Sequence, residues 1–254
     1  MRMGGWEENV KGRFSEADIL MEDSEILVVH KHAGMAVQSA RAGQMDLEHE
    51  LYNYLSTEQE KGMRRPPYLA VIHRLDQPVQ GVLVFGKTPG AAAKLNRQMQ
   101  ENRMGKEYLA VVRGKLNPPE GVLIDYLVKD GKNNRSEVVT EGSAGARRAE
   151  LSYQIVETIQ DQETEMECSL VRIKLKTGRH HQIRVQMAHA GAPLWGDSKY
   201  APNRRDEKRA EGIGLCAFRL TFAHPRTGKR LEFQVSPEGE VFSGFSAAKS
   251  ISGR

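Results

Sequence analysis

The stretch YLAVIHRLDQPVQGVLVFG, residues 68–86, contains two apolar runs on either side of a polar turn. Tyr68–Ile72 and Gly81–Gly86 are rich in aliphatic and β-branched residues, which predicts two strands. The second run has no polar position, so we expect a strand that is buried on both faces. The turn begins with His73-Arg74-Leu75-Asp76, which places a guanidinium and a carboxylate at the end of a buried strand.

The segments around this unit predict one more strand and two helices. Ile19–Val29 has strand character and is followed by a break at Ala33-Gly34. Leu47–Leu55 (LEHELYNYL) spaces its leucines four apart, as in a short amphipathic helix. Thr88-Pro89 predicts a helix start, because Thr caps free N–H groups and Pro suits the first turn. We expect that helix to carry apolar residues on one face and polar residues elsewhere: Ala92, Leu95 and Met99, against Lys94, Arg97 and Gln98.

Strands dominate the rest of the chain and come in neighbouring pairs. Lys106–Arg113 has strand character, and Glu167–Thr177 alternates between apolar and basic residues. A short helix is expected in HHQIRVQMAHAG, after Gly178. Leu215–Phe222 and Arg230–Val235 flank the turn-rich PRTG, which predicts a hairpin. The expected fold class is therefore α+β, with helices flanking an antiparallel or mixed sheet.

Composition excludes several classes of protein. The chain has 254 residues, 39% of them hydrophobic, and no apolar run near the roughly 20 residues of a membrane-spanning helix. Its start has no apolar core typical of a secretory signal, so we expect a cytoplasmic protein. Cys168 and Cys216 stand far apart without a CxxC motif, which favours two reduced residues over one disulfide. The net charge of +4 is compatible with a nucleic-acid partner.

Three segments combine strand context with reactive side chains. In the first, Asp76 suits nucleophilic or acid–base chemistry, although this tetrapeptide taken alone favours a purely structural pair of Arg74 and Asp76 that shapes the turn. In the second, strand alternation places Lys106 and Tyr108 on one face, where the tyrosine could stack on a base or act as an acid–base group. Taken alone, such a residue is more often a tyrosine at the edge of the core with its hydroxyl at the surface. The third, residues 177–184 (TGRHHQIR), offers cations for anion binding at a strand-to-helix junction. Its adjacent histidines point in different directions and lack a third ligand, so no metal site is expected there.

Three motifs in a fixed order give these segments a specific meaning. VIHRLDQPVQGVLVFGK (71–87), KEYLAVVRG (106–114) and LKTGRHHQIRVQMAHAGAPLWGDSKY (175–200) together resemble the RluA-type family of pseudouridine synthases. EDSEILVVHKHAGMAVQ (22–38) is similar to the family's opening strand, and LCAFRLTFAHPRTGKRLEF (215–233) to its closing hairpin. The resemblance covers about residues 19–244, preceded by an N-terminal extension (1–18) and followed by a C-terminal tail (245–254).

The resemblance implies a mixed, mostly antiparallel sheet in two halves, with an active-site cleft across its middle. It also implies isomerisation of uridine to pseudouridine in structured RNA, rRNA or tRNA, without a cofactor or a metal. Carried over by motif position, the catalytic residues are Asp76 as the carboxylate, Tyr108 against the base and Arg184 as the partner of Asp76. Whether Asp76 attacks C1′ or removes a sugar proton stays open.

The resemblance further implies contacts with RNA. Arg74 matches an arginine that holds RNA once the uridine has left its stack, and other contacts or supporting residues are expected at His73, Arg179, His180 and Gln182. Basic loops at Arg64-Arg65, Lys132–Arg135 and Asn203–Arg209 are candidate phosphate contacts, or simply solvated surface.

Two departures from the family pattern stand near these motifs. The chain has Gln77-Pro78-Val79-Gln80 where the family has hydroxyl residues after HRLD, and His32 where it commonly has proline. We expect altered substrate contacts at the first position and a local effect at the second. About 18 residues precede the first matched strand, too few for the S4-type RNA-binding domain of many relatives.

Two other functions remain as alternatives. The first is an RNA-binding or RNA-folding protein with secondary or lost catalysis. The second is a glycosidase, which needs a second carboxylate across the sugar; Glu107, on the face opposite Tyr108, does not supply it. A monomer is expected, because no sustained heptad predicts a coiled-coil dimer.

Overall fold

The structure, a computed structural model, describes residues 14–39, 43–58, 66–160, 166–201 and 212–250. Within these residues the central feature is an 11-stranded sheet. Its main path runs β1 (Ile19–Glu22), β2 (Ile26–Lys31), β4 (Gln80–Gly86), β10 (Leu215–Ala223), β5 (Gly105–Arg113), β9 (Glu167–Leu175), β8 (Arg147–Gln160), β6 (Glu120–Asp130) and β7 (Arg135–Val139). In addition, β3 (Ala70–Val71) pairs with β4, and β11 (Arg230–Gln234) pairs with β10.

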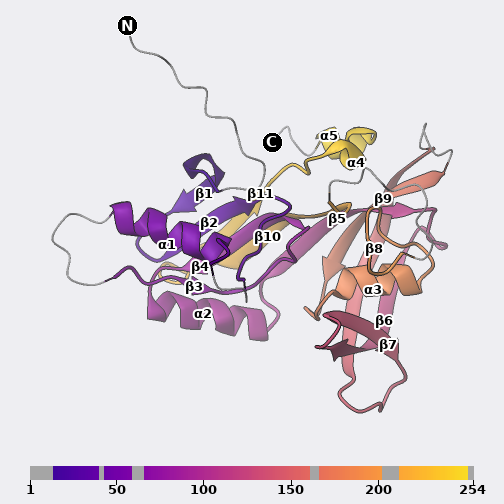
Figure 1. Cartoon of the computed structure of the whole chain (residues 1–254), viewed down its shortest axis with the longest axis horizontal. Coiled ribbons are helices and arrows are strands. Elements are labelled where there is room, and N and C mark those ends of the chain that lie inside the picture. The colour runs from indigo at the N-terminus through magenta and orange to yellow at the C-terminus, as the bar shows by residue number, and fades with distance from the viewer. Residues whose placement is uncertain (1–13, 40–42, 59–65, 161–165, 202–211, 251–254) are drawn as a thin grey trace, which may run out of the picture.

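All strand pairs are antiparallel except β4 and β10, which run parallel over two residue pairs. This short junction joins the half of the sheet that contains β1 to β4 to the half that contains β5 to β9 (Figure 1). Gly81 lies at the junction with φ 137°, and a Cβ there would come within 2.4 Å of the Ala217 carbonyl oxygen. The two strands can therefore approach only because position 81 has no side chain.

The helices cover both faces of the sheet. Leu47 and Leu51 of α1 (Leu47–Glu58) and Ile183 and Met187 of α3 (Gln182–His189) belong to one buried cluster, which also contains Tyr108. The second cluster, on the other face, contains Ala92 and Leu95 of α2 (Pro89–Gln100), Phe242 of α4 (Glu240–Ser243) and Ala248 of α5 (Ser246–Ser250). It also contains Phe245, which lies between α4 and α5. Along β5, successive residues alternate between the two clusters, so Tyr108 faces α1 and α3. A short 3-10 helix, η1 (Glu16–Asp18), precedes β1.

Most elements expected from the sequence are confirmed. β3 and β4 flank the HRLD turn, Thr88 caps α2 by accepting a hydrogen bond from the Ala91 N–H at 3.1 Å, and β10–β11 is an antiparallel hairpin. The fold class, a mixed α+β architecture on a mostly antiparallel sheet, is confirmed. Neither Cys168 nor Cys216 forms a disulfide, and both side chains are buried.

Two details differ from expectation. The single strand region Ile19–Val29 is an antiparallel pair, β1 and β2, because Asp23 accepts hydrogen bonds from the N–H groups of Glu25 and Ile26 and turns the chain. Gln98 was expected among the outward polar residues of α2, and this was wrong. It is buried, and its amide exchanges two hydrogen bonds with the backbone of Ala223, which satisfies its polar atoms inside the core.

The ends of the described chain are packed rather than detached. In the expected C-terminal tail, Phe245 and Ala248 are buried in the second cluster. In the expected N-terminal extension, Asp18 is buried and Phe14 packs against the first cluster. No helix among the described residues is long and apolar enough to cross a membrane.

Candidate active site

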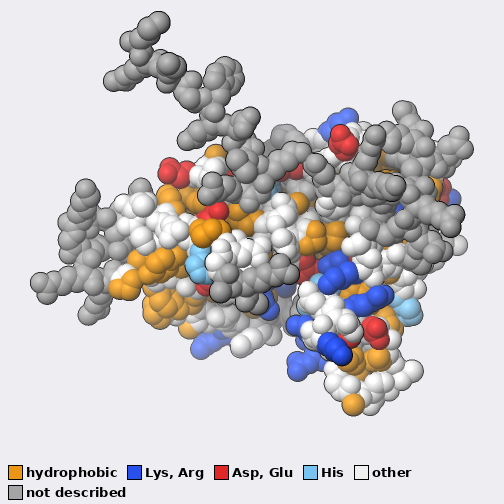
Figure 2. Space-filling model, viewed as in Figure 1, with side chains coloured by type: hydrophobic (Ala, Val, Ile, Leu, Met, Phe, Trp, Pro, Cys, Tyr) orange, Lys and Arg blue, Asp and Glu red, His pale blue; other side chains and the backbone are white. Residues whose placement is uncertain are grey.

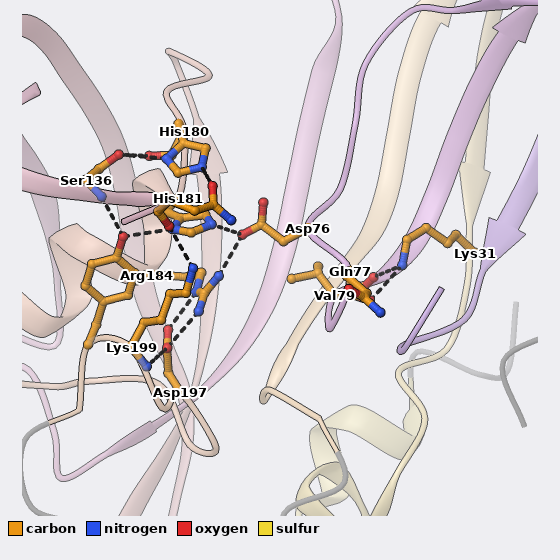
Figure 3. A network of polar contacts seen from close by, with 12 residues as sticks. Lys31, Asp76, Gln77, Val79, Ser136, His180, His181, Arg184, Asp197 and Lys199 are labelled. Atoms are coloured by element: carbon orange, nitrogen blue, oxygen red, sulfur yellow. Dashed lines mark hydrogen bonds and ion pairs between the residues drawn. The ribbon is translucent and has the colours of Figure 1, made fainter. Parts of the chain in front are cut away.

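The site forms where the turn after β3 meets α3. Asp76 lies on that turn, on the same face of the sheet as Tyr108 and α3. Arg184, in the first turn of α3, donates a hydrogen bond from Nη1 to Asp76 Oδ2 at 3.0 Å (Figure 3). The contact joins residues 108 positions apart, one in the turn between β3 and β4 and the other in α3.

Arg184 is held in place from its other side by Asp197. Its Nε and Nη2 donate to the two carboxylate oxygens of Asp197, each at 2.8 Å, in a bidentate pair. Both residues are buried, and Asp197 is 0% exposed. Burial on its own would lower the pKa of Arg184, but the hydrogen bonds and charges of Asp197 and Asp76 outweigh it and raise that pKa. The guanidinium is therefore a permanent, oriented cation beside Asp76.

The two oxygens of Asp76 have different surroundings. Oδ2 takes the Arg184 hydrogen bond and lies 3.4 Å from His181 Nε2, whereas Oδ1 receives no hydrogen bond from the described residues. The side chain is 29% exposed. One oxygen is thus anchored while the other points away from Arg184 (Figure 3), an arrangement that suits a carboxylate that must reach a substrate. The alternative pairing of Asp76 with Arg74 is not what the structure shows, since Asp76 pairs with Arg184 and Arg74 is exposed.

His181 completes the anchor through its contact with Tyr200. The Tyr200 hydroxyl oxygen accepts a hydrogen bond from the Ser136 N–H at 2.8 Å and lies 2.8 Å from His181 Nδ1. The single hydroxyl proton can then go to Nδ1, which leaves the ring proton on Nε2, facing Asp76. The opposite tautomer would turn a ring lone pair toward a carboxylate oxygen. Burial lowers the pKa of His181 to about 4, so the ring is neutral at pH 7.

His180 connects His181 to the β6–β7 hairpin. Its ring stacks on His181 with centroids 3.8 Å apart. Its Nδ1 lies 2.8 Å from the Ser136 hydroxyl oxygen, and its Nε2 lies 3.1 Å from Asn134 Oδ1. The two adjacent histidines therefore support the site through different partners.

A buried lysine fixes the turn that carries Asp76. Lys31, at the end of β2, is 1% exposed, and its ammonium donates to the carbonyl oxygens of His32, Gln77 and Val79 at 2.9, 3.2 and 2.6 Å. Burial lowers the pKa of Lys31 to about 7, against the opposing effect of the Asp76 charge. Only the protonated amine has three N–H donors for the three carbonyls, so the geometry requires the ammonium form.

The glutamines that depart from the family pattern also hold this turn. Gln77 Nε2 donates to the Gly34 carbonyl oxygen at 2.9 Å, and the Gly34 N–H donates to the Gln77 carbonyl oxygen at 2.8 Å. Gln80 is buried and exchanges two hydrogen bonds, each 2.8 Å, with the backbone of Glu238. Amide side chains thus fix the segment that follows Asp76.

Tyr108 of β5 is buried beside the turn, in the cluster that contains Leu75 and Val79. Burial raises the pKa of Tyr108, and the nearby negative charge of Asp76 raises it further. The phenol is therefore neutral at physiological pH and can donate a hydrogen bond or present its ring, but it cannot act as a base from a phenolate.

The residues expected to contact RNA separate into two groups. Arg74 is exposed, and Arg179 is partly exposed, with its Nε bound to the Arg148 carbonyl oxygen at 2.9 Å. Gln182 is buried, and its amide contacts Thr177, Arg179, Glu150 and Gln186. These internal contacts occupy the amide of Gln182, which favours the supporting role expected for it over an RNA contact.

His73 belongs with the scaffold as well. Its Nε2 accepts a long hydrogen bond, 3.4 Å, from the Val84 N–H of β4. Burial lowers the pKa of His73 to about 3, and the charge of Lys106 adds to the effect, so the ring is neutral at pH 7. A neutral ring turned toward β4 does not offer a cation to phosphate.

Sequence reasoning missed four residues of this site: Lys31, His181, Asp197 and Tyr200. Asp197 and Tyr200 lie in GDSKY, at the end of the third motif, which also contains Arg184. A carboxylate in the same motif as the arginine was therefore a signal that could have identified Asp197 as its partner. Lys31 gave no sign of its role in the sequence, because a lysine at a strand end is ordinarily solvated. Of the candidate phosphate loops, Lys132–Arg135 is exposed, while Arg64-Arg65 and Asn203–Arg209 lie outside the described residues.

Comparisons with solved structures define the class of fold. The human RNA pseudouridylate synthase domain containing 4 superposes with a TM-score of 0.71 at 21% identity, covering 92% of each chain. The human domain containing 1 gives a TM-score of 0.69 at 23% identity, covering 89% of this chain and 86% of the other. At these identities the likeness shows the fold alone, which is that of pseudouridylate synthases.

Sequence comparisons then show the family. The profile described as RNA pseudouridylate synthase matches residues 25–189. An RNA pseudouridine synthase of Bacillus subtilis, YlyB, itself uncharacterised, is 34% identical over 86% of this chain and 68% of its own length. Ribosomal large subunit pseudouridine synthase C of Pasteurella multocida is 31% identical over 89% of this chain and 66% of its own length. A tRNA pseudouridine synthase C of Haemophilus ducreyi is 31% identical over 85% of this chain and 89% of its own length. The chain therefore belongs to the RNA pseudouridylate synthase family, whose members are isomerases, and the RluA-type resemblance is confirmed.

Proposed function

We propose that this chain isomerises specific uridines to pseudouridine in structured RNA, rRNA or tRNA, with Asp76 as the catalytic carboxylate. The observation that carries the proposal is the asymmetry of Asp76, whose Oδ2 is anchored by Arg184 while Oδ1 receives no hydrogen bond from the described residues. Relatives at about 30% identity include synthases named for ribosomal large subunit RNA and for tRNA, so both substrate classes remain candidates.

The reaction conserves every atom of the substrate. The N1–C1′ bond of uridine breaks, the uracil turns, and a C5–C1′ bond forms; C5 loses its proton and N1 gains one. Asp76 Oδ1 either attacks C1′ or takes a proton from the sugar, and in both routes it must be ionised. The Arg184 cation donates a hydrogen bond to Oδ2 and balances the negative charge of the carboxylate that the reaction requires.

The neighbouring residues set the geometry of this step. Arg184, itself fixed by Asp197, and the Nε2–H of His181 orient the carboxylate from one side, and Lys31 fixes the turn beneath it. Preorganised dipoles and charges of this kind need no rearrangement as charge develops in the transition state. The neutral Tyr108 lies beside the carboxylate, where its ring can pack against the uracil and its hydroxyl can donate a hydrogen bond.

RNA must bind with the target base extruded, at a cost of a few kcal/mol of unstacking. Exposed basic side chains on the β6–β7–β8 end supply phosphate contacts: Lys129, Lys132, Arg135, Arg147 and Arg148. Figure 2 shows Lys and Arg side chains gathered over this end of the molecule. Arg74, exposed and two residues from Asp76, is suited to hold the RNA around the extruded base.

The glycosidase alternative lacks its second carboxylate. Asp197 is 0% exposed and committed to Arg184, and Glu107 pairs with Arg172 and Arg219 on the other face of the sheet. Neither can face Asp76 across a sugar among the described residues. The expectations of a cytoplasmic monomer that needs no cofactor remain predictions.

The test is to map pseudouridine across all RNA from cells with and without this gene, complemented with wild type or with Asp76→Ala. The proposal predicts that one or a few sites disappear and return only with the wild-type gene. If no site changes, or if Asp76→Ala restores the lost sites, the alternative of an RNA-binding or RNA-folding protein gains support and the proposed role of Asp76 fails.

A further inference from the structure

Two histidines share one side of the chain at the end of β2. His30 lies in the strand and His32 follows its last residue, so alternation turns both rings to one face and Lys31 to the other. The ring centroids are 4.7 Å apart. The His30 side chain is only 12% exposed, yet its Nε2 has no hydrogen-bond partner among the described residues.

A carboxylate from a distant part of the chain faces both rings. Glu238 lies between β11 and α4, and its Oε2 is 2.9 Å from His32 Nδ1 while its Oε1 is 3.9 Å from His30 Nδ1. One ligand atom from each of the three residues lies within 4.8 Å of the others. Ligand atoms bound to one tetrahedral zinc ion at about 2.0 Å stand about 3.3 Å apart, so shifts below about 1 Å would bring them into register.

The residues behind this cluster hold its members in position. His32 Nε2 lies 2.7 Å from Asp18 Oδ1, which directs Nδ1 toward Glu238. A carboxylate on the far nitrogen of a histidine is the usual support of a histidine metal ligand. The backbone of Glu238 is fixed by the two hydrogen bonds to Gln80. The Glu238 side chain is 53% exposed, so an ion can enter from solvent.

We propose that His30, His32 and Glu238 bind one divalent transition-metal ion of the zinc class, with water completing the coordination. Two imidazoles and one carboxylate suit zinc and its neighbours in the first transition row and disfavour magnesium and calcium, which prefer all-oxygen sites. The ion joins η1, β2 and the segment before α4, on the face of β2 opposite the ammonium of Lys31. It takes no part in the proposed isomerisation.

The competing state of this cluster contains a proton in place of the ion. Hydrogen bonds from Asp18 and Glu238 raise the pKa of His32 to about 10, so without metal the ring is a cation between two carboxylates. The competing state therefore predicts an ion-pair cluster that needs no metal. The two states make opposite predictions about stoichiometric binding.

The experiment titrates the purified, chelator-treated full chain with Co²⁺, followed by visible absorption, and then displaces the cobalt with Zn²⁺. The proposal predicts saturation at one ion per chain, and thermal unfolding at a higher temperature when Zn²⁺ is bound. His32→Pro, which introduces the residue common in the family, and Glu238→Gln should each weaken binding at least about tenfold. Asp18→Asn should weaken it about 10- to 100-fold.

The matched control is His189→Ala. His189 is exposed and also pairs with a carboxylate, Asp125 at 2.9 Å, but lies outside the cluster. Its removal should leave binding unchanged, and circular dichroism checks that each variant is folded. The proposal fails if the wild type shows no saturable binding, as the ion-pair state predicts. It also fails if folded His32→Pro and Glu238→Gln bind as tightly as the wild type.

Discussion

Arg184 is fixed by Asp197 through two hydrogen bonds of 2.8 Å, which aim its remaining nitrogen, Nη1, at the candidate catalytic carboxylate. The pair is buried, and its role is to orient a cation toward Asp76. Asp197 is thus a positioning residue, which acts on the substrate only through Arg184.

Replacing Asp197 should damage catalysis more than RNA binding. In Asp197→Asn one of the two acceptors becomes a donor that faces the guanidinium, so Arg184 loses its orientation. We expect kcat to fall about 100-fold, or ~2.7 kcal/mol, with KM for RNA nearly unchanged. The free energy of unfolding should fall by about 3–5 kcal/mol, as when one partner of a buried ion pair is removed.

The matched control for this variant is Asp125→Asn, which alters a carboxylate that contacts α3 through Gln186 but not Arg184. It should keep most of the wild-type kcat. A large rise in KM for Asp197→Asn with kcat unchanged would contradict a positioning role.

In Tyr200→Phe, His181 should no longer be held in a single tautomer. The variant removes the hydroxyl proton that goes to Nδ1, so the ring can exchange its proton between the two nitrogens. We expect kcat to fall about tenfold, or ~1.4 kcal/mol, without a change in KM. Nitrogen NMR of the imidazole should show protonated Nε2 in the wild type and a mixture in the variant.

Tyr126→Phe is the comparison for Tyr200→Phe, since Tyr126 also uses its hydroxyl in a side-chain contact, with Glu141. It should leave both kcat and the His181 spectrum unchanged. If the wild type already shows a tautomer mixture, the inferred chain of hydrogen bonds from Ser136 to Asp76 is wrong.

Lys31→Met should misplace the turn that carries Asp76. Methionine fills a similar volume but leaves the carbonyl oxygens of His32 and Val79 without their lysine donor, whereas the Gln77 carbonyl keeps the Gly34 N–H. We expect kcat to fall at least about tenfold, and each unsatisfied buried carbonyl to cost about 1–3 kcal/mol of stability. The exposed Lys129→Met should change neither quantity, apart from a weaker affinity for RNA. Wild-type kcat in a folded Lys31→Met protein would contradict this role of Lys31.

Acid should destabilise the fold through His73 and His181. Burial lowers their pKa values to about 3 and about 4, below the 6.5 of an unperturbed histidine. Between pH 6.5 and 4 the unfolded chain therefore binds protons that the folded chain does not, so stability falls as the pH is lowered. Each group contributes a slope of up to ~1.4 kcal/mol per pH unit.

Urea unfolding at several pH values measures this slope. His73→Leu should flatten it relative to the wild type. His49→Ala should leave it unchanged, because the hydrogen bond to Asp46 raises the pKa of His49, so the contribution of that residue varies with pH above 6.5 and not between 6.5 and 4. Identical slopes for the wild type and His73→Leu would show that His73 is not buried in its neutral form.

The sequence predicted best where each element has one clear pattern. The buried β4, the capped α2 and the alternating β9 were all expected, because continuous apolar runs, Thr-Pro caps and period-two alternation are each typical of one kind of element. The same patterns failed for β6, which no expectation covered. Val122 and Ile124 are exposed there while Leu123 is partly buried, so apolar residues occupy both faces and the alternation disappears.

Site residues could be predicted when they belong to a recognisable sequence motif. They were missed when their role depends on contacts between segments far apart in the chain. Asp76 and Arg184 followed from the resemblance, and the structure brings them to 3.0 Å. Lys31 could not be found, since its role depends on three carbonyl oxygens that sequence patterns do not describe. Gln182 lies inside a functional motif, which suggested a contact with RNA, but its amide forms hydrogen bonds with the backbone of Arg179 and Glu150.

The most direct test of the central claim is the pseudouridine content of RNA treated with purified enzyme. RNA from cells that lack the gene is incubated with the wild type or with Asp76→Asn, which keeps the shape of the side chain and removes its charge. Pseudouridine is then located by chemical labelling and counted by mass spectrometry. We predict new pseudouridine at one or a few positions with the wild type, and none above background with Asp76→Asn. Equal pseudouridine formation by the two proteins would contradict a catalytic role for Asp76.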